Sequence, residues 1–288
     1  MEVRVQMTSS LFLSVTTFIY LLAALCYCGG WLFRNQLAGK IGSLVAWMGL
    51  GLLTGGLILR WVESYRLGIG HAPLSNFYES LVFGAWSVVL VYLVMELRYR
   101  NRALGVFPLS VAFLAMAYAS FSPNVESKIQ PLIPALKSNW LIAHVITCFL
   151  GYAAFAVACG LGMLYLLKRR SNPKGNPESS LLHRLPSIIT LDELIYQNVV
   201  FGFLLLSLGI ITGSVWANSA WGRYWSWDPK ETWSLITWLV YALMLHSRMV
   251  RGWHGRRMAW LSIIGFACVL FTYFGVNFLL SGLHSYAQ

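Results

Sequence analysis

Long apolar runs separated by short polar stretches dominate the sequence. Most of them reach the roughly 20 residues that an α-helix needs to cross the hydrocarbon core of a bilayer. Eight such runs cover approximately residues 9–33, 42–60, 78–97, 103–121, 139–167, 191–217, 231–250 and 258–281. The pattern predicts an all-α, polytopic membrane helix bundle with about eight transmembrane helices. It also predicts that residues 1–288 form a single integral membrane domain.

The composition agrees with this prediction. Hydrophobic residues make up 58% of the chain and charged residues only 11%, whereas an average soluble domain is about 25% charged. So few charges cannot cover a water-facing surface, which excludes a soluble globular enzyme. The aromatic content of 15% excludes a disordered chain, because disordered chains are polar and poor in aromatic residues.

The positive charge predicts the orientation of the helices. The net charge is +11, and 14 of the 21 lysines and arginines lie in the loops after the first, third, fifth and seventh runs. Lysine and arginine accumulate in cytoplasmic loops. We therefore expect both termini on the outer (periplasmic or lumenal) side. We interpret the charges as topology determinants and expect no nucleic-acid partner.

A tryptophan-rich segment stands out on the expected outer side, at about residues 216–233. Six of the chain's 13 tryptophans lie between Trp216 and Trp238. A belt of tryptophans at the membrane interface is one interpretation. A flat aromatic platform for a large planar ligand is the other, and the charged residues within the segment favour it. Asp228 followed by Pro229 also indicates a helix start. The candidate platform residues are Trp221, Trp225, Trp227, Asp228 and Trp233.

Three histidines are candidate ligands. His144 lies about 7 Å below the outer end of its run, at about 1.5 Å per residue, and His284 follows the last run at the same side. His246 lies roughly 22 Å into the seventh run, in the inner half of the bilayer, where an ionisable residue is a functional candidate. Histidine is a common axial ligand of heme iron, so heme at the outer surface is one hypothesis. A hydrogen-bonded structural role is the alternative for each histidine, and we leave His71 out of the ligands.

The run W-G-R-Y-W-S-W-D-P-K-E-T-W from Trp221 to Trp233 resembles the WWD signature of the heme-handling proteins of cytochrome c biogenesis. Three further stretches resemble the CcsA/ResC branch, the System II cytochrome c synthase component. They are Pro73–Glu79, Leu245–Arg248 and Gly282–Tyr286. The resemblance extends from about residue 70 to the end of the chain.

The resemblance implies two heme sites. At the outer site, heme b would be bound as a substrate, with His144 and His284 as axial ligands above the tryptophan platform. At an inner membrane site, His246 would be one ligand. The second inner ligand would come from a CcsB/ResB-type partner membrane protein.

The resemblance also implies an activity, which is covalent thioether attachment of heme to the C-x-x-C-H motif of apocytochrome c. The chain would be a heme-attachment component that is active only with its partner, and no residue is assigned as catalytic. Proteins of a thiol-reducing pathway would be further partners. The expected location is the bacterial cytoplasmic (inner) membrane, or the thylakoid membrane in a photosynthetic organism, with the active site facing the outer side.

Three other functions stay open at this point. A membrane b-type cytochrome would pair histidines on facing helices at both depths, but the inner half offers only His246. A transporter of heme or another anion would be favoured by inverted repeats or broken midplane helices, and neither is clear. An assembly scaffold would use its tryptophans only as membrane anchors.

Overall fold

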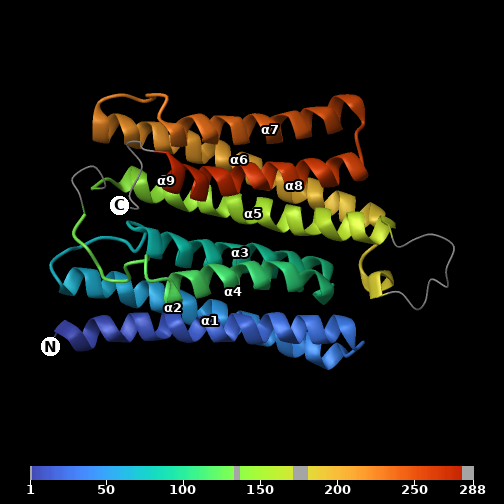
Figure 1. Ribbon diagram of the computed structural model, residues 1–288, viewed down its shortest axis with the longest axis horizontal. Helices are drawn as coiled ribbons and strands as arrows, with labels where there is room; N and C mark the ends of the chain where they lie inside the picture. The colour runs from blue at the N-terminus through green and yellow to red at the C-terminus, as the bar shows by residue number, and fades with distance from the viewer. Residues whose placement is uncertain (1, 133–136, 171–180, 281–288) are drawn as a thin grey trace. The chain divides into compact units, whose positions relative to one another are not determined.

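The structure is a computed structural model that describes residues 2–132, 137–170 and 181–280. Within these ranges the chain is helical and contains no strand. Figure 1 labels helices α1 to α9 and colours the chain from blue at the N-terminus to red at the C-terminus. In chain order, the helices are α1 (Glu2–Leu32), α2 (Gln36–Arg66), α3 (Phe77–Tyr99), η1 (Arg102–Gly105), α4 (Val106–Phe121), α5 (Asn139–Arg170), η4 (Leu181–Arg184), α6 (Ile188–Trp221), α7 (Pro229–Arg251), α8 (Arg256–Leu270), η5 (Phe271–Gly275) and α9 (Val276–Leu279).

The prediction of a multi-pass membrane bundle is confirmed. Seven helical segments of the described chain are long and apolar enough to cross a membrane. Six of the eight predicted runs each coincide with one helix, the fourth coincides with η1 and α4, and the described part of the eighth coincides with α8, η5 and α9. The helices extend beyond most of the predicted ends by a few residues. The seventh run forms α7, which has 23 residues but is not among the seven apolar segments. The reason is that tryptophan, serine, threonine and His246 interrupt its apolar positions.

The chain divides into two compact units. The first comprises residues Met1–Val145 and Ser219–Trp221, and the second comprises Ile146–Asn218 and Gly222–Gln288. The single membrane domain expected for residues 1–288 stays a prediction.

Helices α1 to α4 build the first unit. Small residues on α2 allow α1 to approach closely, and a Cβ atom added at Gly49 would lie only 2.7 Å from the Tyr20 ring. Two buried carboxylates of this unit, Glu79 and Glu96, have charged or hydrogen-bonding partners, which lower the cost of burying them. The Arg60 guanidinium binds the Glu79 carboxylate at 2.8 Å, with both side chains buried. The Glu96 carboxylate accepts hydrogen bonds from Tyr27 at 2.5 Å and from Tyr92 at 2.6 Å.

The second unit contains most of α5 together with α6, α7, α8, η5 and α9. The Phe155 ring of α5 stacks on the Tyr241 ring of α7, with 3.6 Å between centroids and 6° between planes. Gly202 of α6 provides room beside this pair, because an added Cβ atom would lie 2.6 Å from the Phe155 ring. This unit carries most of the tryptophan-rich segment and therefore most of the candidate site.

Candidate functional site

The tryptophan-rich segment is the connection between α6 and α7. Helix α6 ends at Trp221, and Gly222 follows in the left-handed region with φ of 73°, a conformation that glycine adopts without steric cost. The chain is then irregular up to Asp228. Trp227 has a φ of 59°, which is uncommon for a residue with a Cβ atom. Its side chain is 69% exposed, so the chain holds a large apolar ring outward in an unfavourable backbone conformation.

The carboxylate of Glu231 holds this connection in shape. It accepts hydrogen bonds from the backbone N–H of Ser226 at 2.7 Å, from the Ser226 hydroxyl at 3.1 Å and from the backbone N–H of Asp228 at 3.2 Å. Asp228 caps α7 in turn, and together the two acids form a capping box with Pro229 in the first turn. The predicted helix start at Asp228 and Pro229 is therefore confirmed. Both acids shape the loop.

The loop presents aromatic surface. Trp225 and Trp227 pack edge to face, with 5.7 Å between centroids and 87° between planes. Tyr224 is exposed as well. The indole N–H of Trp225 is buried and has no acceptor among the described residues. An unpaired buried donor is costly, so this N–H is suited to an acceptor from outside the described residues.

The first turns of α7 are fixed to the last helical segment. Trp233 lies 4.2 Å from the Phe271 ring, measured between centroids. The Thr272 hydroxyl lies 3.3 Å from the Trp233 carbonyl oxygen. The Lys230 ammonium donates to the Asn277 side-chain oxygen at 2.7 Å. Phe271 and Thr272 belong to η5, a π-helical turn, and such turns occur frequently at functional sites.

Lys230 lies in the first turn of α7, one residue before the predicted run 231–250. Helix α7 is not one of the seven segments that are apolar enough to cross a membrane. Desolvation lowers the pKa of Lys230 to about 8, and the Asp228 carboxylate partly opposes this shift. Burial thus disfavours the charged form of Lys230, which lies beside the loop that carries the tryptophans.

The candidate residues fall into two groups. Trp225, Trp227, Asp228 and Trp233 belong to the second unit, where the capping box and the contact with η5 bring them together. His144 and Trp221 belong to the first unit. His144 lies near the start of α5 and is half-buried. His284 lies outside the described residues.

His246 has a different environment. It lies in the last two turns of α7, its side chain is exposed, and none of the residues described in the structure hydrogen-bonds to it. Within the described ranges, no group of three or more His, Cys, Asp and Glu residues is arranged to hold a metal ion.

The His71 ring lies between two backbone carbonyl groups of the first unit. It is buried, with Nδ1 2.8 Å from the Ala72 carbonyl oxygen and Nε2 3.0 Å from the Gln130 carbonyl oxygen. Because both ring nitrogens face carbonyl oxygens, His71 connects two loops and offers no free nitrogen to a metal.

Sequence reasoning missed one polar centre, which lies at the His246 end of α7. Asp192, near the start of α6, binds the Arg248 guanidinium at 2.8 Å, the Gly255 backbone N–H at 2.7 Å and His254 Nδ1 at 3.3 Å. It thereby joins α6 to the end of α7 and to the turn before α8. The sequence does contain a signal for this centre, because Asp192 is an acidic residue at the second position of the apolar run 191–217.

Comparisons with known proteins agree with one another. A family model described as cytochrome C assembly protein matches residues 74–284. The chain is 39% identical to "Cytochrome c biogenesis protein CcsA" of Gloeobacter violaceus, over 95% of this chain and 92% of the relative. It is also 39% identical to the CcsA protein of Guillardia theta, over 95% of this chain and 94% of the relative.

A solved structure shares the fold. "Cytochrome c Heme Lyase CcmF" superposes on 97% of this chain with a TM-score of 0.70 and 16% sequence identity. This chain spans 47% of the length of that protein, so the likeness concerns the fold alone. The family match and the two CcsA relatives lead to one conclusion: the chain belongs to the cytochrome c assembly protein family.

Proposed function

We propose that this protein binds heme b as a substrate and presents it at the outer membrane face for covalent attachment to apocytochrome c. The relatives are named cytochrome c biogenesis proteins, and the structural neighbour is named a heme lyase. One observation carries the proposal, which is the packed pair of the half-buried Trp225 and the exposed Trp227, in a loop held in place by the Glu231 carboxylate. A fixed, outward-facing aromatic surface is suited to stacking against a porphyrin.

At the outer site, each candidate residue has a role. Trp221, Trp225, Trp227 and Trp233 line the porphyrin platform, and Asp228 shapes the loop as the helix cap. His144 and His284 are the axial ligands of the iron. The unpaired indole N–H of Trp225 is a donor that fits a heme propionate.

At the inner membrane site, His246 supplies one ligand and a CcsB/ResB-type partner supplies the other. The exposure of His246 and its lack of a hydrogen-bond partner among the described residues support this role. Placing an imidazole on the exposed surface of a membrane helix costs free energy unless the imidazole meets a partner there. The chain is therefore active only together with that partner.

The reaction joins two cysteine thiols of a C-x-x-C-H motif to the two heme vinyl groups. At each vinyl group, a C–S bond forms at one carbon and the thiol proton passes to the other, without net oxidation. The thiols must be reduced, which makes proteins of a thiol-reducing pathway partners of the reaction. Ligation by two histidines keeps the iron six-coordinate, and the histidine of the C-x-x-C-H motif displaces one of them in the product.

The location follows from the same proposal. The protein lies in the bacterial cytoplasmic membrane, or in the thylakoid membrane of a photosynthetic organism. Both termini and the tryptophan-rich loop face the outer side, because the basic loops face the cytoplasm.

The first test is the absorption spectrum of the protein purified after coexpression with its partner. We expect a six-coordinate heme spectrum whose outer-site contribution His144→Gly removes and added imidazole restores. His183→Gly is the matched control, because His183 is an exposed residue of the short helix η4, outside the proposed sites. A wild-type protein without heme, or an unchanged His144→Gly spectrum, would overturn the proposal.

A second test separates attachment from heme transport. Coexpression with a tagged apocytochrome c should yield covalently bound heme that survives denaturation, and His144→Gly should abolish it. Free heme outside the membrane without any covalent product would instead favour transport.

A further inference from the structure

A basic pocket lies between the end of α5 and the start of α8, within the second unit. Its volume is about 510 Å³. Its lining residues are Leu166, Leu167, Arg169, Arg170, Arg256 and Trp260. None of them belongs to the tryptophan-rich segment or to the candidate heme ligands.

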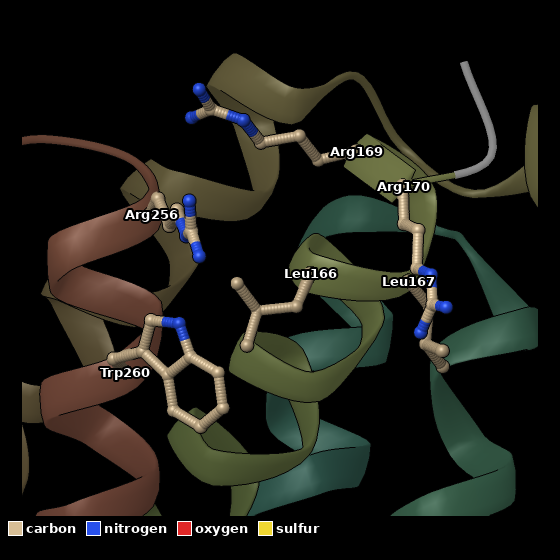
Figure 2. A pocket seen from close by; sticks show the side chains of 6 residues that line it. All are labelled: Leu166, Leu167, Arg169, Arg170, Arg256 and Trp260. Carbon is tan, nitrogen blue, oxygen red and sulfur yellow. The ribbon is translucent and has the colours of Figure 1, made fainter. Parts of the chain in front are cut away.

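Figure 2 shows how these side chains are distributed. Arg256 and Trp260 of α8 face Leu166 of α5, and the Arg169 side chain extends over the same side of α5. Arg170 and Leu167 lie on the other side of α5. Arg256 and Trp260 are four residues apart and so share one face of the helix. The pocket therefore combines guanidinium groups at the helix ends with apolar side chains one turn further along.

The three arginines are exposed. No carboxylate of the described residues forms an ion pair with Arg169, Arg170 or Arg256. Arg60, Arg102 and Arg248, by contrast, each form an ion pair with a carboxylate. Guanidinium groups bind phosphate through paired hydrogen bonds. The charge at this pocket is thus available to an anionic ligand.

The apolar part of the pocket indicates that this ligand also has a hydrocarbon part. Trp260 is 48% exposed and Leu167 is 52% exposed. Both lie near the ends of segments that are apolar enough to cross a membrane. Tryptophan prefers the level of the lipid headgroups, and basic pockets between membrane helices bind anionic headgroups. A free anion would use the arginines but not the apolar wall.

We propose that this pocket binds an anionic phospholipid, with its phosphate between Arg169 and Arg256 and an acyl chain along Leu166 and Trp260. The lipid would hold the end of α5 against the start of α8. This site is separate from the proposed heme sites, so the two proposals can fail independently.

Native mass spectrometry of the full chain in detergent tests the proposal. The protein is titrated with phosphatidylglycerol and, separately, with phosphatidylcholine. We expect selective retention of phosphatidylglycerol. The double variant Arg169→Gln, Arg256→Gln should weaken that retention by about 25-fold, since each arginine near the surface contributes about five-fold.

The double variant Arg251→Gln, Arg257→Gln is the matched control. It removes the same amount of charge from two exposed arginines that do not line the pocket. Arg251 is the last residue of α7, and Arg257 lies in the first turn of α8. We expect it to retain phosphatidylglycerol like the wild type. Thermal unfolding of both double variants in detergent checks that each is folded.

Two competition arms distinguish the ligand sources. Excess inorganic phosphate should not release the lipid, because it cannot replace the contacts of the acyl chain, and hemin should not release it either. Release by phosphate would show an anion site without lipid preference, and release by hemin would show a heme carboxylate site. Release by phosphate or by hemin would overturn the proposal. Equal retention of both lipids, or an equal loss of retention in both double variants, would overturn it as well.

Discussion

The Glu231 carboxylate accepts a hydrogen bond from the backbone N–H of Ser226, five residues earlier in the chain, at 2.7 Å. A side chain in the first turn of α7 thus closes the loop that carries Trp225 and Trp227. The geometry of the aromatic surface depends on this carboxylate, although no stacking contact involves it.

Replacing the carboxylate should therefore weaken heme binding. Glu231→Ala removes an acceptor of three hydrogen bonds. These bonds act on heme only through the shape of the loop, so we take the loss of binding free energy as about 1.4 kcal/mol. We expect about ten-fold weaker hemin retention, measured by titration followed by absorption. Glu126→Ala, at an exposed position outside the segment, should leave retention unchanged. Wild-type retention in Glu231→Ala would show that the loop shape does not matter for binding.

Trp227 allows stability and function to be separated. Trp227→Gly relieves a left-handed backbone that costs about 1–2 kcal/mol in a residue with a Cβ atom, so the thermal midpoint should stay the same or rise. The same change removes an exposed aromatic ring, so heme attachment to a tagged apocytochrome should fall several-fold. Trp227→Phe keeps a ring and should retain most of the activity. Full attachment by the glycine variant would contradict a platform role for Trp227.

His246 should affect heme content without affecting folding, because its side chain is exposed. We expect His246→Ala, purified with the partner, to lose the inner-site heme and to regain it with added imidazole, as measured by heme absorbance per protein. The control is Leu243→Ala, which removes another exposed side chain of α7 at 57% exposure. Unchanged heme content in His246→Ala would rule out His246 as a ligand.

Asp192 and Glu193 offer a matched pair for stability, because both bind Arg248. The Asp192 side chain is 12% exposed and that of Glu193 is 49% exposed. Removing one partner of a buried pair costs about 3–5 kcal/mol, whereas an exposed pair contributes about 0–1 kcal/mol. Asp192→Asn should thus lower the thermal midpoint strongly and Glu193→Gln barely. Similar midpoints would argue against Asp192 as the joint between α6 and α7.

The sequence predicted the features that depend on local pattern. The apolar runs matched the helices, and Asp228 with Pro229 marked the start of α7. Contacts between distant residues leave no such pattern, which is why the Lys230–Asn277 hydrogen bond and the Asp192 centre were not foreseen. The backbone of Trp227 was not foreseen either, because it is imposed by the Glu231 hydrogen bonds and not by tryptophan's own preference. His284 stays a prediction.

The π-helical turn at Phe271–Gly275 also determines where the following residues point. Such a turn amounts to one residue inserted into an α-helix, and each residue advances an α-helix by about 100°. Deleting one residue there would bring the last helix back into α-helical phase and rotate Asn277 away from Lys230. A single inserted residue therefore sets the direction in which the end of the last helix faces the tryptophan-bearing loop.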